Sequence, residues 1–229
     1  MIAAYRAEIN EGAARTTRLR LRDKNGQYHW VEGRSAQFID NRGEPDGILS
    51  SFHTIDAQIH AEKVLKDRAR YDELTGLINR AEVFRRLRTL LTQQPRTGHE
   101  TAVAFCDLDA FKEINDTYGH HMGDHVLKAL AEEMRGLLRE DDLIARIGGD
   151  EILLILNGVH NIATAVRVAE KIRRAAAQTH HYLDNVYTPK MSIGVTLVRP
   201  GEDPDDVIAR ADRAMYRAKQ AGGNQTIAN

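Results

Sequence analysis

The 229 residues of this chain include 32 Lys and Arg, 33 Asp and Glu and one cysteine, for a formal net charge of −1. The length suits one or two domains, and the balanced charge excludes a nucleic-acid binder that works through an overall positive field. The lone Cys106 excludes an internal disulfide framework and is typical of a reducing compartment. No apolar run approaches the roughly 20 residues of a membrane-spanning helix, and the first ten residues lack the apolar core of a signal peptide. We therefore expect a soluble cytoplasmic protein with no membrane contact and no nucleic-acid polymer as partner.

The first quarter of the chain has the pattern of an antiparallel meander. Thr17, Leu19 and Leu21 alternate with charged residues, which indicates a half-buried strand, and Asn25-Gly26 is a hairpin signal. The expected strands cover residues 14–22, 27–39 and 48–55. Three strands without covering helices bury little apolar surface, so we expect an incomplete domain.

Three pieces of this meander resemble the C-terminal half of a PAS sensor domain. They are residues 20–26, residues 28–32 and the strand that ends at residues 52–56. A generic hairpin extension is the alternative interpretation. Residues 56–71 are charged and free of Gly and Pro, which predicts a helix, either a connector between sensor and output or a solvated linker. We assign residues 1–55 to the partial sensor and 56–71 to the linker.

From Asp72 onward, short apolar strands alternate with helical stretches, so an α/β fold is expected. One obvious hairpin makes the central sheet mixed instead of wholly parallel. The expected strands cover residues 101–106, 143–147, 152–156 and 191–198, and the expected helices cover 123–138, 162–177 and 205–221.

Two acidic clusters follow strands of this sheet. Asp107-Leu108-Asp109 ends one strand, and Gly148-Gly149-Asp150-Glu151 forms the hairpin turn. Carboxylates gathered at strand ends suit Mg²⁺, and a pair of such ions supports phosphoryl transfer. For Asp109, which precedes a helical stretch, a helix cap is the favoured interpretation. Neither cluster is specific when taken alone.

The clusters and the segments around them form an ordered series. The series consists of residues 72–80, residues 107–116, Gly119-His120, Gly123-Asp124, residues 146–152, residues 192–195 and residues 211–219. In this order and spacing, the chain resembles the GGDEF-domain diguanylate cyclases over roughly residues 71–229. The resemblance implies a nucleotidyl-cyclase-like fold that condenses two GTP molecules into cyclic di-GMP, in a homodimer whose geometry the sensor controls.

The resemblance also implies roles for individual residues. Asp107, the Leu108 carbonyl and Asp150 are implied as ligands of two Mg²⁺ or Mn²⁺ ions. Glu151 is implied either as a further ligand or as the group that helps to deprotonate the ribose hydroxyl. The implied GTP contacts are Asn115 and Asp124 to guanine, Lys112 and Lys219 to phosphate, Phe111 beside the site, and Arg146 to the transferring phosphoryl group.

Arg139 and Asp142, five residues before the Gly-Gly pair, resemble the family's product-inhibition site, with Arg167, Arg173 or Arg174 as a second arginine. Two positions depart from the family pattern. Ile152 stands where Phe is usual, an apolar exchange that a core position tolerates. Gly223 stands where Arg is usual, which predicts weaker GTP binding with the chemistry retained. A catalytically silent GTP or cyclic di-GMP receptor is the main alternative, and an enzyme that makes another cyclic nucleotide is a third.

Overall fold

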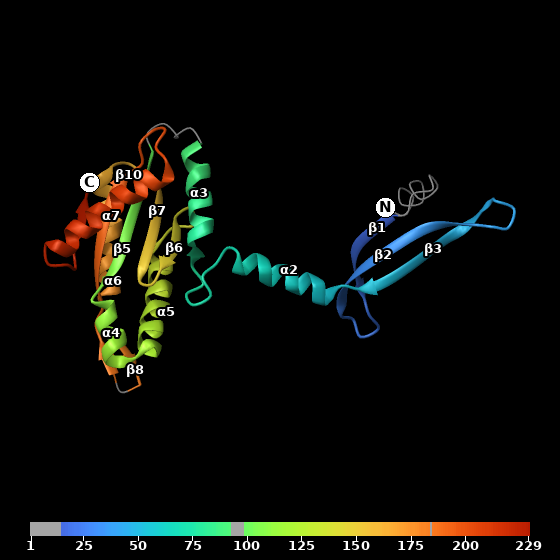
Figure 1. Cartoon of the computed structure of the whole chain (residues 1–229), viewed down its shortest axis with the longest axis horizontal. Coiled ribbons are helices and arrows are strands. Elements are labelled where there is room, and N and C mark those ends of the chain that lie inside the picture. Colours follow the sequence, from blue (N-terminus) through green and yellow to red (C-terminus); the bar gives the residue numbers. More distant parts are fainter. Residues whose placement is uncertain (1–14, 93–98, 184) are drawn as a thin grey trace. The chain divides into compact units, whose positions relative to one another are not determined.

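The computed structural model describes residues 15–92, 99–183 and 185–229. The chain divides into two compact units, one that ends at Asp67 and one that runs from Arg68 to Asn229 (Figure 1). None of the helices in the described ranges has the length and apolar character needed to cross a membrane.

The first unit is a three-stranded antiparallel sheet followed by one helix, as the sequence predicts. The sheet has the order β1-β2-β3, and its elements are β1 (Arg15–Arg22), β2 (Tyr28–Ile39), β3 (Pro45–Thr54) and α2 (Asp56–Arg68). The Asp23 carboxylate accepts hydrogen bonds from the backbone N–H groups of Asn25 and Gln27, at 2.9 and 2.8 Å. These bonds close the hairpin between β1 and β2. At the start of α2, Asp56 accepts a bond of 2.7 Å from the Trp30 N–H, which joins the helix to the sheet.

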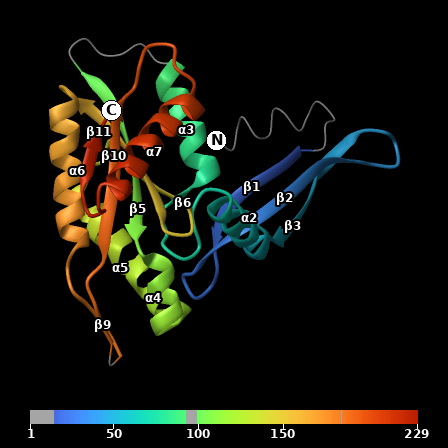
Figure 2. The same ribbon diagram turned by 60° about the vertical axis from the view of Figure 1, so that its left-hand side comes forward.

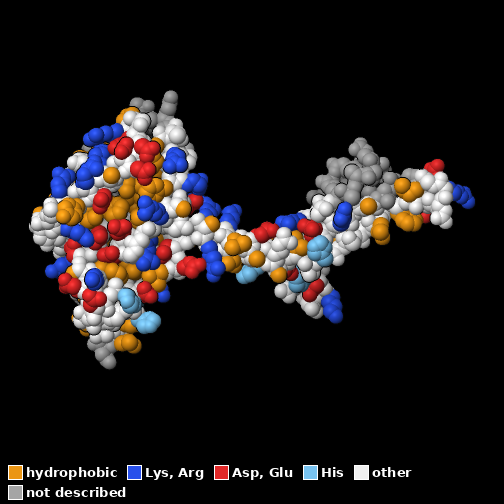
Figure 3. Space-filling view, in the orientation of Figure 1, with side chains coloured by type: hydrophobic (Ala, Val, Ile, Leu, Met, Phe, Trp, Pro, Cys, Tyr) orange, Lys and Arg blue, Asp and Glu red, His pale blue; other side chains and the backbone are white. Residues whose placement is uncertain are grey.

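The half-buried face predicted for residues 14–22 is confirmed at Thr17 and Leu19 and wrong at Leu21. Pairing places Leu21, Ile48 and Phe52 on one face, where they are 45%, 42% and 54% exposed. Hydrophobic side chains are accordingly visible on the surface of the unit (Figure 3). Three strands and one helix are too few to cover both faces. Helix α2 contributes no buried residue.

The second unit is built on a six-stranded mixed sheet of order β11-β10-β5-β7-β6-β4. The β10/β11 and β4/β6 pairs are parallel and the other pairs are antiparallel, which confirms the mixed α/β class. The strands are β4 (Ile78–Asn79), β5 (Glu100–Asp109), β6 (Leu143–Gly148), β7 (Glu151–Val159), β10 (Lys190–Leu197) and β11 (Thr226–Ala228), and β8 (His180–Tyr182) and β9 (Asn185–Tyr187) form a separate hairpin.

Helices cover both faces of this sheet (Figures 1 and 2). One layer consists of α4 (Phe111–Tyr118), α5 (His120–Leu137) and α6 (Ile162–Ala176), and the other consists of α3 (Arg80–Thr92) and α7 (Pro204–Gln220). Strand β5 alternates between the two cores. Ala104, Cys106 and Leu108 are buried in the α4–α6 layer, and Phe105 is buried in the α3/α7 layer. By the same alternation, Asp107 and Asp109 lie on the α3/α7 face.

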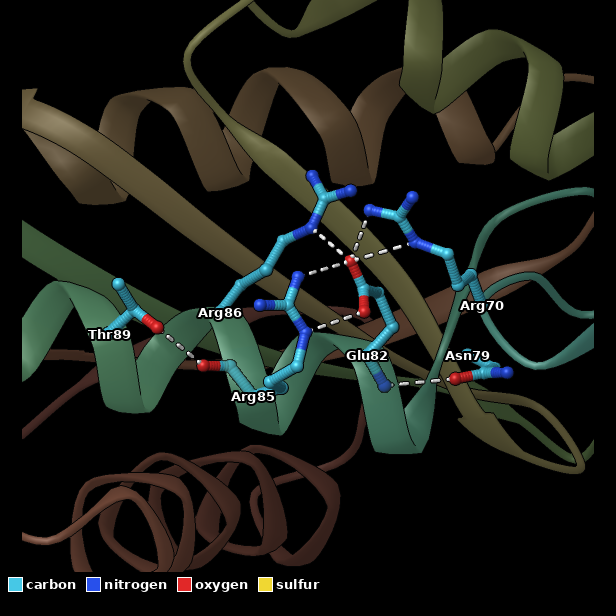
Figure 4. Close-up of polar contacts among 6 residues, drawn as sticks. All are labelled: Arg70, Asn79, Glu82, Arg85, Arg86 and Thr89. Carbon is cyan, nitrogen blue, oxygen red and sulfur yellow. Dashed lines mark hydrogen bonds and ion pairs between the residues drawn. The ribbon is translucent and has the colours of Figure 1, made fainter. Parts of the chain in front are cut away.

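A carboxylate surrounded by arginines fastens the start of the second unit. Glu82, only 5% exposed at the start of α3, binds the guanidinium groups of Arg70, Arg85 and Arg86 at 2.8–2.9 Å (Figure 4). The Asn79 side chain accepts a bond of 3.0 Å from the Glu82 N–H and so caps the helix. Arg70 precedes β4, so the cluster ties the incoming chain to α3.

Replacement of Glu82 by Gln is expected to destabilise the second unit by about 2 kcal/mol at pH 7, because three guanidinium groups lose their shared anion. The arginines hold the pKa of Glu82 far below its ordinary value, against the opposing effect of burial. A depressed carboxyl pKa contributes stability above the unfolded-state value of about 4.5, and that contribution is lost as the pH falls below it. The difference between variant and wild type should therefore shrink in acid. Chemical denaturation between pH 7 and pH 3 measures this.

The matched control is Glu73→Gln, because Glu73 pairs with Arg68 at 3.0 Å while both side chains are well exposed. Exposed pairs contribute little, so we expect a change below about 0.5 kcal/mol. Equal effects of the two substitutions at pH 7 would contradict the importance of the buried cluster.

Candidate active site

Three carboxylates meet where β5 and the β6–β7 hairpin end. Asp107 of β5 lies directly opposite Glu151 of β7 in the antiparallel register, so both side chains are on the α3/α7 face. Asp150 follows Gly149 in the turn between β6 and β7, and Gly149 has the left-handed φ of 54° that glycine adopts readily. The two acidic clusters identified in the sequence are thus brought together. Leu108 lies between Asp107 and Asp109, with its side chain buried in the other layer.

The carboxylates repel one another. Burial and then the charge of Asp107 raise the pKa of Asp150 to about 6. Burial, Asp107 and Asp212 raise the pKa of Glu151. Among the residues that the structure describes, the ammonium group in contact with them belongs to Lys219 of α7, which forms an ion pair with Asp107. Negative charge therefore exceeds positive charge among these four side chains.

The donor set fits a hard divalent cation, because surplus carboxylate charge and oxygen ligands are what Mg²⁺ prefers. Within the described ranges, no three His, Cys, Asp or Glu side chains are gathered into a ready metal-binding group. In the conformation described, Lys219 neutralises Asp107 instead. The carboxylates therefore provide part of the coordination shell of a metal ion. Water or phosphate oxygens would provide the remaining ligands.

Asp109 does not cap α4, so the cap prediction is wrong. The residue at the cap position is Ala110, in a left-handed conformation with φ 59°, and no side chain caps the helix. The Asp109 carboxylate instead accepts bonds of 2.7 Å from the Ser192 hydroxyl and from the Asn224 N–H. It joins the end of β5 to β10 and to the turn after α7. The spacing of Asp107 and Asp109 by two residues in a strand is the sequence signal for their shared face.

The predicted nucleobase contacts lie in the other layer, on α4 and α5. A Cβ atom on Gly123 would lie 2.1 Å from the Asn115 Oδ1 atom and 3.1 Å from the Phe111 Cζ atom. The Asn115 side chain therefore rests directly on the α5 backbone, one residue before the half-buried Asp124. Gly123 was noted in the sequence only as part of a motif. Its position shows that the approach of Asn115 to α5 requires a glycine. Lys112 is exposed in the first turn of α4.

Arg146 is held by the protein itself. Its guanidinium donates to the Gly149 carbonyl at 2.8 Å and to both carboxylate oxygens of Asp72 at 3.0 and 3.2 Å. These bonds support the turn that carries Asp150. The predicted contact of Arg146 with a phosphoryl group remains a prediction.

Residues 69–225 match the family described as "Diguanylate cyclase, GGDEF domain". The chain belongs to the GGDEF family. It is 36% identical to diguanylate cyclase DgcP of Pseudomonas aeruginosa over 193 residues, which are 84% of this chain and 28% of DgcP. It is 35% identical to diguanylate cyclase DgcM of Escherichia coli over 181 residues, 79% of this chain and 43% of DgcM. The chain thus spans less than half of the length of these curated GGDEF relatives.

Solved GGDEF structures share the fold. The structure of diguanylate cyclase SiaD of Pseudomonas aeruginosa with its activator SiaC has a TM-score of 0.68 and 34% identity, covering 76% of this chain and 66% of SiaD. The coiled coil and GGDEF domain of DgcB from Caulobacter crescentus, in complex with c-di-GMP, has a TM-score of 0.69 and 28% identity, covering 76% of this chain and 92% of that one. The predicted GGDEF-like α/β fold with a mixed central sheet is therefore confirmed.

Proposed function

We propose that this chain is a diguanylate cyclase, which condenses two GTP molecules into cyclic di-GMP and two pyrophosphates. The observation that carries the proposal is the group of Asp107, Asp150 and Glu151 beside Lys219 at the end of β5. A receptor without catalysis has no evident need for three carboxylates that repel one another. The names of the relatives support the same activity.

Asp107, Asp150 and the Leu108 carbonyl would hold Mg²⁺ or Mn²⁺, two ions per active site, with Glu151 as a further candidate. Such ions, when bound, polarise the phosphate and lower the pKa of the attacking hydroxyl. Glu151 is alternatively the base that takes the hydroxyl proton. Its place opposite Asp107 is compatible with either role.

Asn115 and Asp124 are proposed to recognise guanine. The carboxylate can accept hydrogen bonds from the N–H groups at the edge of the base, and the amide can donate a hydrogen bond to the guanine oxygen. Adenine would leave these groups unpaired. Lys112 and Lys219 are proposed to bind phosphate, and Phe111 packs beside the base-binding residues. Arg146 is proposed to act on the phosphoryl group or, through Gly149, to position Asp150.

The reaction requires two copies of the chain. Each ribose 3′-oxygen attacks the α-phosphorus of the other GTP, the bond from that phosphorus to pyrophosphate breaks, and the hydroxyl proton leaves to a base. One GGDEF unit binds one GTP, so we propose a two-fold homodimer in which two sites face each other. Residues 1–55 are proposed as a partial PAS-like sensor, and residues 56–71 as the connector that sets the placement of the two catalytic units.

A silent GTP or cyclic di-GMP receptor is the second candidate, and Gly223 in place of the usual arginine favours it. Incubation of the purified chain with GTP and Mg²⁺ at several protein concentrations separates the two. Cyclic di-GMP that forms faster than linearly with protein concentration supports the dimeric cyclase. Bound GTP with no product at any concentration supports the receptor, and a different cyclic product supports another cyclase.

Product inhibition is proposed at Arg139 and Asp142. Asp142 accepts bonds from the backbone N–H groups of Arg139 and Asn157, at 3.1 and 3.0 Å, and lines a small surface pocket of about 80 Å³. The exposed Arg139 guanidinium makes no bond to a described side chain, so it is free to bind a ligand. Arg167 supports a second contact, because it donates to Thr164 of the same pocket. Arg173 and Arg174 instead pair with Glu170.

Replacement of Arg139 by Ala is expected to raise the cyclic di-GMP concentration for half-inhibition by about tenfold or more, because a charged hydrogen bond to the ligand is lost. The initial rate without product should not change. Initial-rate assays with added cyclic di-GMP measure both. Arg213→Ala, an exposed arginine on α7 in the opposite layer, serves as control. An unchanged inhibition curve for the Arg139 variant would contradict the assignment.

A further inference from the structure

The turn after α7 packs closely against Asp109. Gly222, Gly223 and Asn224 all have positive φ, at 109°, 71° and 49°. A Cβ atom on Gly223 would lie 3.0 Å from the Asp109 Oδ2 atom. The turn is therefore packed against Asp109 and carries no cationic side chain where the GGDEF family commonly has an arginine. An arginine at position 223 would add a positive charge and also backbone strain, because the φ of 71° is unfavourable for any side chain. Comparison of Gly223→Arg with Gly223→Ala would separate the effect of the charge from that of the strain.

A lysine lies opposite the same aspartate on the neighbouring strand. Lys190 is the first residue of β10, and the antiparallel register pairs it directly with Asp109. Ser192, two residues further along β10, donates to Asp109, so Lys190 shares the face of Asp107, Asp109 and Glu151. Directly opposed side chains in a sheet have Cβ atoms only about 5 Å apart. The flexible stem of a lysine is longer than that distance, so the ammonium group of Lys190 can reach past Asp109 toward a ligand at this edge of the sheet.

Lys190 is available to a ligand. Its side chain is exposed and forms no hydrogen bond or ion pair with the described residues. Lys219, in contrast, is engaged with Asp107. A nucleoside triphosphate brings several negative charges, and an unpaired ammonium group beside the carboxylates can bind them in addition to the proposed metal ions.

We propose that Lys190 binds the terminal phosphates of GTP and supplies the charge that Gly223 does not. This inference rests on the proposed function. It makes Lys190 a substrate-binding residue on the strand beside the turn that carries Gly223. Gly223 is then compatible with phosphate binding, because Lys190 of the adjacent strand β10 provides the cation.

The test is equilibrium binding of GTP, GDP and GMP to the full chain with Mg²⁺, for wild type, Lys190→Ala and Lys190→Arg. Lys190→Ala should weaken GTP about tenfold or more, leave GMP unchanged within about twofold, and keep the melting temperature of the wild type. Lys190→Arg should restore most of the GTP affinity, since it keeps the charge. Lys128→Ala, an exposed lysine on α5, is the matched control and should change nothing.

The outcomes separate the two proposals. Wild-type chain that makes cyclic di-GMP, together with a Lys190→Ala variant of unchanged GTP affinity, overturns the role of Lys190 and leaves the cyclase intact. An equal loss of GTP and GMP binding also overturns it, because the effect would not reside at the terminal phosphates. A wild-type chain that binds none of the nucleotides overturns the proposed function and this inference together.

Discussion

Replacement of Asp150 by Asn is expected to abolish cyclic di-GMP synthesis, with a loss of about a thousandfold or more, while the metal-free protein becomes more stable by about 1 kcal/mol. Both effects have one cause. Asp150 is partly buried beside Asp107, and burial, followed by the charge of Asp107, raises its pKa to about 6. The neutral amide removes that repulsion and with it the charge that attracts a cation. Product formation and thermal melting without metal measure the two effects.

Magnesium provides a third readout for the same variant. It should raise the melting temperature of the wild type, because a ligand that binds only the folded state stabilises it. It should not raise that of Asp150→Asn. The control is Asp141→Asn, an exposed carboxylate that should affect neither rate nor melting. A variant of Asp150 with a tenth of the wild-type rate would exclude it as an essential ligand.

Replacement of Gly123 by Ala is expected to weaken GTP binding by about tenfold to a hundredfold. The added methyl group would lie 2.1 Å from Asn115 Oδ1, so the side chain must leave its place on α5. Loss of a proposed guanine contact lowers the preference for GTP over ATP as well as the affinity. Overpacking should also cost stability, by about 1–3 kcal/mol. Competition binding of GTP and ATP measures the first effect and denaturation the second.

The same helix contains the control. Gly136 of α5 has open space where a Cβ atom would be, so Gly136→Ala should bind GTP as the wild type does. It should even gain about 0.5–1 kcal/mol, because alanine favours a helix more than glycine. Equal GTP affinity of the two alanine variants would show that GTP binding does not depend on the contact between Asn115 and Gly123.

The sequence predicts most strands and helices of the second unit because each has a clear period. It also predicts that the acids meet, because carboxylates at neighbouring strand ends share an edge. In the first unit the burial prediction fails at Leu21, since the alternation of Leu19 and Leu21 shows which residues share a face and not whether another element covers each of them.

The contacts of Asp109 and Arg146 lie beyond sequence reasoning. Asp109 precedes a helical stretch, so a cap is the natural prediction, but its partners Ser192 and Asn224 are 83 and 115 residues away in the chain. Arg146 likewise finds Asp72 across 74 residues. The register of β10 against β5, which no local pattern fixes, is also what places Lys190 opposite Asp109. The tertiary structure thus determines the partners of Asp109, the partner of Arg146 and the place of Lys190.

The two halves of the proposed site belong to opposite layers of one sheet. Asn115 and Asp124 stand on α4 and α5, whereas Lys219 stands on α7 across the end of β5. A nucleotide bound as proposed therefore links the two helical layers on opposite faces of the sheet. The helices of either layer can then unfold locally only if they release their end of the ligand. Substrate binding then reduces the local unfolding of both helical layers at once, whereas without substrate each layer fluctuates independently.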